Sequence, residues 1–257
     1  MTDNLAGAWA RPNVVSFYST HRNKKSDLHA SEAYFLHKLL RKGIKVLDVG
    51  CAVGGFCALL RELQPDIQYT GVDISETMIL EARRRYPDNR FEVSQADQLP
   101  FQNGEFDLVL CTGGTLPMIL TWRDVLRECW RVTNERALFD IRVVAEGEDV
   151  EDMTRSYVKL DFAGQWDGHT IAPYVIITMA SLYQAIRSLN PDPGEIRGYG
   201  YYHAVSEMAV TSFDEVCMTT LCVGKPSATI PPGFEWQVPI PWPNCDPAKS
   251  PNRAKRL

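Results

Sequence analysis

The chain has 257 residues, of which 45% are hydrophobic and 23% are charged, a composition close to that of average globular proteins. This length fits one large α/β domain with insertions better than two small domains. The formal net charge of −5 argues against nucleic acid as a partner, because binding to a phosphate backbone depends on clustered Lys and Arg.

The sequence also bears on the cellular compartment. Its seven cysteines include no Cys-x-x-Cys pair and no His cluster of zinc-ligand spacing, so we expect a reduced protein without a metal site. Met1–Ala10 lacks the basic and apolar regions of a signal peptide, and the longest uncharged stretch, Thr170–Ile186, is too short and too polar to span a bilayer. We therefore expect a cytoplasmic protein with no membrane span. The sequence does not indicate an oligomeric state.

Residues 1–42 are interpreted as an N-terminal cap, in which Ser31–Leu40 has the spacing of an amphipathic helix. From Lys45 to Val143, short β-branched runs alternate with amphipathic stretches, as is typical of βαβ units around a parallel sheet. Helical spacing is clearest just before Arg131. The expected strands are Lys45–Val49, Gln68–Asp73, Arg90–Gln95, Phe106–Cys111 and Ala137–Val143.

The pattern changes after the fifth strand. Residues 144–183 are expected to form an insertion with a hairpin-like pair of strands, Ser156–Phe162 and Ile171–Thr178. A helix at Ala180–Leu189 and two closing strands, Glu195–Ala204 and Glu215–Val223, then complete a main domain of residues 43–225. The two closing strands are expected to pair as an antiparallel hairpin.

Residues 226–257 contain eight prolines and are expected to be an extended tail, because proline interrupts helices and central strands. The aromatic side chains Phe234, Trp236 and Trp242 favour docking of this tail on the domain. A flexible chain end is the alternative.

The segment Val46–Phe56, VLDVGCAVGGF, reads as a buried strand, an acidic residue and a glycine-rich turn that opens a helix. Such a turn brings bare backbone and a helix N-terminus up to a cofactor. Its spacing also satisfies a loose dinucleotide pattern, but Asp48 would repel a pyrophosphate and attract the ammonium and sulfonium groups of S-adenosylmethionine. The turn residues expected to bind the cofactor are Asp48, Gly50, Cys51, Ala52 and Gly54.

A second acidic strand end lies in Tyr69–Met78, YTGVDISETM. A carboxylate at Asp73 can accept both hydrogen bonds from a ribose diol, and Ile74 and Met78 offer apolar faces to adenine. A helix N-cap is the structural alternative for Asp73. This feature alone is compatible with NAD as well.

The segment SQADQLPF, Ser94–Phe101, precedes NGEFDLVLCTGGTL, Asn103–Leu116. Together with the two preceding segments, these resemble the class I S-adenosylmethionine-dependent methyltransferases, especially the branch similar to quinone-biosynthesis methyltransferases. The resemblance covers roughly residues 43–143. It implies a Rossmann-like α/β fold with a seven-stranded, mostly parallel sheet, an antiparallel closing hairpin, an N-terminal helical cap and an insertion after strand 5.

The same resemblance implies roles for individual residues. Asp97 would bind the adenine amino group and Ala96 would supply a backbone N–H to the ring. Asp73 would hold the ribose, while Asp48 and Gly50 would meet the methionine end. Cys111 and Thr112 would line the floor near the methyl group.

Candidates on the acceptor side are weaker. No general base is identified; His203 could face the acceptor and is a weak catalytic candidate, but a structural histidine explains it better. Possible acceptor contacts, each also explicable as packing, are Tyr18, His21, Thr115, Trp166 and Tyr202.

The fourth strand ends in Cys111-Thr112-Gly113-Gly114, which lacks the Asn/Asp-Pro-Pro-aromatic turn of methyltransferases that act on nucleobases or amides. A small-molecule, lipid or saccharide-linked acceptor is therefore expected, methylated by in-line displacement. Two alternatives stay open: an NAD-dependent oxidoreductase, and a non-catalytic Rossmann-like binding module.

Overall fold

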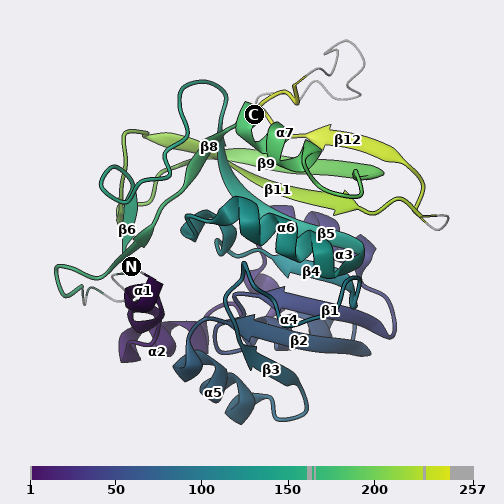
Figure 1. Cartoon of the computed structure of the whole chain (residues 1–257). Coiled ribbons are helices and arrows are strands. Elements are labelled where there is room, and N and C mark those ends of the chain that lie inside the picture. The colour runs from purple at the N-terminus through teal and green to yellow at the C-terminus, as the bar shows by residue number, and fades with distance from the viewer. Residues whose placement is uncertain (1, 161–163, 165, 228–229, 244–257) are drawn as a thin grey trace.

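A central sheet organises the fold, and the computed structural model of the chain describes residues 2–160, 164, 166–227 and 230–243 (Figure 1). Five parallel strands stand in the order β3-β2-β1-β4-β5, and all five were expected from the sequence. The last of them begins earlier than expected. Their bounds are β1 (Ile44–Val49), β2 (Ile67–Asp73), β3 (Arg90–Val93), β4 (Phe106–Cys111) and β5 (Thr133–Val144).

The closing hairpin is confirmed. Strand β11 (Glu215–Gly224) pairs antiparallel with both β5 and β9 (Glu195–Ala204). Two further strands join the sheet: β8 (Ile176–Thr178) beside the end of β5, and β12 (Gly233–Gln237) beside β9. Over the described residues the sheet therefore has nine strands, where seven were expected.

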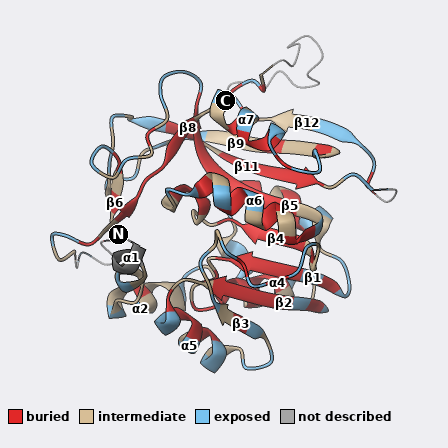
Figure 2. Cartoon of the chain, viewed as in Figure 1, coloured by how far each residue is buried: buried red, intermediate tan, exposed pale blue. Residues whose placement is uncertain are grey.

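Helices cover both faces of the sheet, so that β1, β2, β4, β5 and β11 are largely buried, whereas the strands at its edges are more exposed (Figure 2). On one face lie α6 (Trp122–Val132) and α7 (Met179–Arg187), with Trp122 and Trp130 fully buried. On the other face lie α3 (Ala30–Leu39), α4 (Gly55–Leu63) and α5 (Glu76–Arg85). Burial of both faces explains why the parallel strands read as continuous apolar runs.

The cap and the insertion lie beyond the carboxyl ends of β1, β2 and β4. The cap consists of α1 (Thr2–Trp9), α2 (Pro12–Thr20) and a short 3-10 helix, η1 (Lys25–Asp27). Strands β6 (Tyr157–Lys159) and β7 (Ile171–Pro173) of the insertion form a small antiparallel sheet with β10 (Ala209–Val210), which follows β9 in the chain.

The second strand expected in the insertion, Ile171–Thr178, is divided in two. After Pro173 the backbone N–H of Val175 donates to the carbonyl of Pro117 at 2.8 Å, and the chain then resumes as β8 in the main sheet. Pro117 belongs to a 3-10 helix, η2 (Leu116–Met118), in the loop after β4. A tertiary hydrogen bond thus splits a continuous apolar run. The end of the first expected strand, at residues 161–162, lies outside the described residues.

The tail docks on the domain over its described part. The indole of Trp236 lies over Gly198 of β9 and donates to the carbonyl of Ile240 at 2.8 Å. Trp242 is buried, with its ring centroid 4.7 Å from that of Trp236. The expected docking is therefore seen for Trp236 and Trp242, whereas Phe234 is 48% exposed; residues 244–257 lie outside the described chain.

A methyl group at position 198 tests this docking. A Cβ on Gly198 would collide with the ring of Trp236, so Gly198→Ala should lower the free energy of unfolding by about 1–3 kcal/mol, as measured by urea denaturation. The control is Gly233→Ala in β12, where the nearest atom to a new Cβ is the Pro231 carbonyl oxygen at 3.9 Å. Equal stability of the two variants would contradict the docked position of Trp236.

Candidate functional site

The turn between β1 and α4 adopts left-handed backbone at Gly50, Ala52 and Gly54, with φ of 81°, 47° and 77°. The N–H groups of Gly50 and Cys51 both donate to the carbonyl of Val72 on β2, at 2.8 and 2.9 Å. A Cβ on Gly50 would collide with Thr115 of the loop after β4. Glycine is required here because the turn and that loop approach closely at the edge of the sheet.

Two carboxylates, one buried and one half-buried, flank the turn. Asp48 accepts a hydrogen bond from the hydroxyl of Tyr69 at 2.5 Å, and burial raises its pKa to about 7. Asp73 accepts from the backbone N–H of Ala52 at 3.0 Å and from that of Ser75 at 2.9 Å, and burial raises its pKa as well. Asp73 therefore shapes the turn as well as facing the space above it.

Asp97 lies on the loop after β3. One of its carboxylate oxygens, Oδ2, accepts from the hydroxyl of Thr121 at 3.0 Å. The other oxygen, Oδ1, is buried and has no hydrogen-bond partner among the described residues. A buried acceptor of this kind is normally satisfied, so this oxygen is available to a donor from a ligand.

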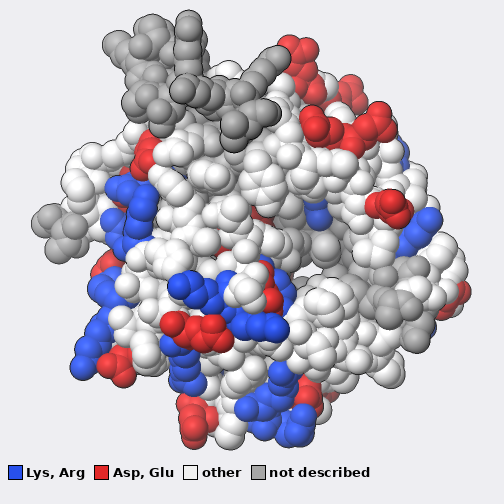
Figure 3. Space-filling view, turned by 180° about the vertical axis from the view of Figure 1, so that it is seen from behind, with Lys and Arg blue, Asp and Glu red and all other residues white. Residues whose placement is uncertain are grey.

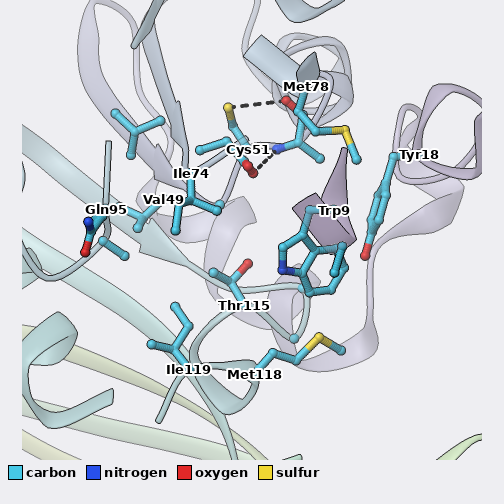
Figure 4. A pocket seen from close by; sticks show the side chains of 18 of the residues that line it. Trp9, Tyr18, Val49, Cys51, Ile74, Met78, Gln95, Thr115, Met118 and Ile119 are labelled. Carbon is cyan, nitrogen blue, oxygen red and sulfur yellow. Dashed lines mark hydrogen bonds between the residues drawn. The ribbon is translucent and has the colours of Figure 1, made fainter. Parts of the chain in front are cut away.

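A cavity of about 800 Å³ brings these groups together. Trp9 of α1 and Tyr18 of α2 face Thr115 and Met118 of the loop after β4 across it (Figure 4). Of the residues expected to bind the cofactor, those that line the cavity are Asp48, Gly50, Cys51, Ala52, Asp73, Ile74, Met78, Ala96, Asp97 and Thr112. Of those expected to contact the acceptor, Tyr18, His21 and Thr115 line it too.

The remaining expected residues do not line this cavity. Gly54 is the residue before α4, where a Cβ would meet Phe91 at 2.9 Å, and Cys111 is fully buried in the core. The indole of Trp166 donates to the carbonyl of Thr170 at 2.8 Å, within the insertion. Tyr202 is 48% exposed, and the ring of His203 lies 2.8 Å from the neighbouring carbonyl of Ala204. The structure therefore does not bring these residues to the cavity.

Sequence reasoning missed Arg22, which lines the cavity from the cap. Its guanidinium forms a two-pronged ion pair with buried Glu32 of α3, at 2.6 and 2.8 Å. Its carbonyl oxygen packs on Gly55 and its guanidinium lies beside Gly113, so one residue of the cap touches the loops after β1 and after β4. Arg22 has a φ of 61°, and nothing in the sequence signals this conformation.

Sequence reasoning also missed Asp140 on β5. Its carboxylate accepts from the backbone N–H groups of Gly113 and Gly114, at 2.8 and 3.3 Å, and thereby shapes the loop after β4. Burial raises its pKa to about 7. The glycine pair could have suggested a tight turn, but not which side chain holds it.

The sheet order, the glycine-rich turn and the acidic strand ends define a Rossmann-like α/β protein with a cofactor-sized cavity at the carboxyl edge of its sheet. Residues 46–136 match the family model of a methyltransferase domain. Demethylmenaquinone methyltransferase of Thermotoga maritima is 36% identical over 92 residues, which cover 36% of this chain and 40% of the relative. Malonyl-[acyl-carrier protein] O-methyltransferase of Geobacter sulfurreducens is 30% identical over 106 residues, covering 40% of this chain and 39% of the relative.

This fold is shared by a solved structure from Thermotoga maritima, with a TM-score of 0.52. That protein is an S-adenosylmethionine-dependent methyltransferase, named as a possible histamine N-methyltransferase. It is 19% identical and the match covers 86% of this chain and 99% of that one. Over residues 46–136 the chain is thus similar to methyltransferase domains, and its fold is shared with a methyltransferase of known structure. The aligned stretch spans about two fifths of each curated relative. No helix in the described part of the chain is long and apolar enough to cross a membrane.

The ion pair of Arg22 and Glu32 can be tested through stability. Arg22→Met leaves Glu32 buried without its cation and should lower the free energy of unfolding by about 3–5 kcal/mol in urea denaturation. The double variant Arg22→Met/Glu32→Met removes both charges and should recover most of that loss. A small effect of the single substitution, or no recovery in the double variant, would contradict a tight buried pair.

The raised pKa values of Asp48 and Asp140 predict the pH dependence of stability. Both carboxyls keep their protons to about pH 7 in the folded protein but release them near pH 4 once unfolded. The stabilisation they give is therefore complete in acid and is lost as pH rises through 7, by up to about 1.4 kcal/mol per pH unit for each group.

Thermal or urea unfolding of the cofactor-free protein between pH 5 and 8 measures this slope. Asp48→Asn and Asp140→Asn should each flatten it, and the double variant should flatten it most. A slope that is the same in all four proteins would show that neither carboxyl titrates near neutrality.

Proposed function

We propose that this chain is an enzyme that transfers a methyl group from S-adenosylmethionine to a small-molecule, lipid-linked or saccharide-linked acceptor. The observation that carries the proposal is the meeting of three carboxylates, those of Asp48, Asp73 and Asp97, at one cavity beside a glycine-rich turn. S-adenosylmethionine is cationic at its sulfonium and ammonium groups, and its ribose and adenine carry hydrogen-bond donors. A set of acceptors of this kind suits it.

Each carboxylate has a separate part in this proposal. Asp48 faces the ammonium of the methionine end, and the cation lets it ionise despite its burial. Asp73 accepts from the ribose diol. The unpartnered Oδ1 of Asp97 accepts from the adenine amino group, while Ile74 and Met78 contact the ring.

The acceptor binds in the part of the cavity between the cap, the insertion and the loop after β4. Trp9, Tyr18, Met118 and Ile171 give this part apolar walls, which exclude water from the reacting atoms. Methyl transfer by in-line displacement needs the acceptor atom held against the methyl carbon, and positioning supplies much of the rate. A quinone precursor and an acyl-carrier-bound acid, named for the two curated relatives, are both acceptors of the expected size and character.

The alternative of an NAD-dependent oxidoreductase is disfavoured on electrostatic grounds. The dianionic pyrophosphate of NAD would lie at the turn beside Asp48, and Asp48 would repel it once ionised. None of the matches described above supports this alternative.

Calorimetric titration with S-adenosylmethionine, S-adenosylhomocysteine and NAD tests the proposal. The first two should bind in the micromolar range or tighter, and NAD should not bind. Asp73→Ala should weaken both by about 1.5–3 kcal/mol, the usual value of hydrogen bonds to a charged group. Asp73→Asn, which keeps one acceptor oxygen for the N–H of Ala52, should lose less. Binding of NAD alone, or unchanged affinity in Asp73→Ala, would overturn this assignment.

A further inference from the structure

A second polar region lies on the α3 face of the sheet, behind Gly113 and Gly114. Asp140 of β5 is paired in register with Thr220 of β11, and Arg142 with Met218, which in turn faces Tyr201 of β9. Residues that are paired across strands point to the same face, as do alternate residues along one strand. The side chains of β5, β11 and β9 thus converge beneath the start of α3.

Several atoms of this region have no hydrogen-bond partner among the described residues. They are buried, and they are Ser31 Oγ, Arg142 Nε, His203 Nε2 and Thr220 Oγ1. Buried polar groups are normally satisfied, so four such atoms on one face indicate a place where a polar group is bound. The space-filling view from this side is hollowed, and acidic and basic atoms are recessed in the hollow (Figure 3).

Arg142 is the strongest of these groups. Its side chain is 5% exposed, its Nη1 donates to the carbonyl of Pro117 at 3.0 Å, and its guanidinium carbon lies 3.6 Å from the ring centroid of Tyr174. No carboxylate of the described residues lies within ion-pair distance of it, and burial lowers its pKa. A buried guanidinium that contacts a carbonyl and an aromatic ring but no carboxylate keeps much of the cost of its burial, and an anion would offset that cost.

The nearest acid does not supply that anion in full. Asp140 lies two positions before Arg142 on β5, but its oxygens accept from Gly113 and Gly114 and its pKa is about 7. Near neutral pH this carboxyl is only partly ionised. Glu32, the other buried acid nearby, is neutralised by Arg22.

Arg142 also stands directly behind the acceptor side of the cavity. Its partner Pro117 precedes Met118, which lines the cavity. Tyr174, over which its guanidinium lies, packs in one apolar cluster with Met118 and Trp9. Arg142 itself does not line the cavity, so a ligand that rests on Trp9 and Met118 would contact it only after side chains between them move.

We infer that Arg142 binds a carboxylate of the methyl acceptor, while Trp9 and Met118 contact the acceptor's apolar part. The inference rests on the proposed function, because it takes this cavity as the acceptor site. The carbonyl of Pro117 accepts from Nη1 of Arg142. The other edge of the guanidinium, which carries Nε, therefore remains for a two-pronged pairing with one carboxylate. Arg142 anchors the acceptor through a group that is not itself methylated.

Octanoate and octanamide are suitable probes, because they share an apolar chain and differ in charge. With S-adenosylhomocysteine at saturation, calorimetry should show that the wild-type protein binds octanoate at least about 10-fold more tightly than octanamide. Arg142→Met should abolish this preference and Arg142→Lys should reduce it, whereas Arg155→Met, at an exposed arginine of the insertion, should keep it. Equal binding of the two probes to the wild-type protein overturns the inference.

Stability gives a second readout that separates a binding arginine from a structural one. If Arg142 is an uncompensated cation, Arg142→Met should raise the melting temperature of the ligand-free protein by a few degrees. A lowered melting temperature or failure to fold would show that its bonds to Pro117 and Tyr174 are structural, and would overturn the inference. The proposed function is judged separately, by the affinity for S-adenosylhomocysteine: absence of that binding contradicts the cofactor and leaves the preference for octanoate to be measured on the protein alone.

Discussion

The buried ion pair between Arg22 and Glu32 is the interaction on which the arrangement of the site depends. It fixes the cap to α3, and through the backbone of Arg22 it fixes the cap to Gly55 at the start of α4. Trp9 and Tyr18 then face the loop after β4 across a cavity instead of extending into solvent. Without this pair, the cofactor half of the chain would keep its turn and its acids but would lose one wall of the cavity.

Around this pair the structure buries more acid than base. Asp48 and Asp140 both have pKa values of about 7 because burial penalises their ionised forms, and the pKa of Asp73 is raised for the same reason. A domain that gathered these carboxyls for stability alone would be better served by apolar side chains. Burying these carboxyls lowers the stability of the fold. A cationic ligand would offset this loss, because its charge stabilises their ionised forms.

The cofactor side of the site could be predicted because its residues stand at strand ends that the sequence marks. Asp48, Gly50 and Asp73 follow apolar runs directly, and Asp97 lies in a recognisable loop, so local pattern was enough to bring them to one edge of the sheet. Arg22 and Asp140 could not be found in this way, since their roles depend on contacts with Glu32 of α3 and with Gly113 in the loop after β4, which no local pattern marks. The fold shows the same division: the presence of β1 to β5 follows from periodicity, whereas the break after Pro173 comes from a hydrogen bond to a distant carbonyl.

The stretch that is shared with the methyltransferase family covers only part of the site. The stretch shared with the methyltransferase family, residues 46–136, contains the acids and the turn that would hold the cofactor. Trp9 and Tyr18 precede this stretch, and Ile171 and Arg142 follow it. Because the acceptor wall and the buried guanidinium behind it lie outside the shared stretch, similarity there says what kind of group is transferred and carries no information about the molecule that receives it. The acceptor has to be inferred from the chemistry of the cap, the insertion and the end of β5, where the guanidinium of Arg142 is buried without an ion pair among the described residues.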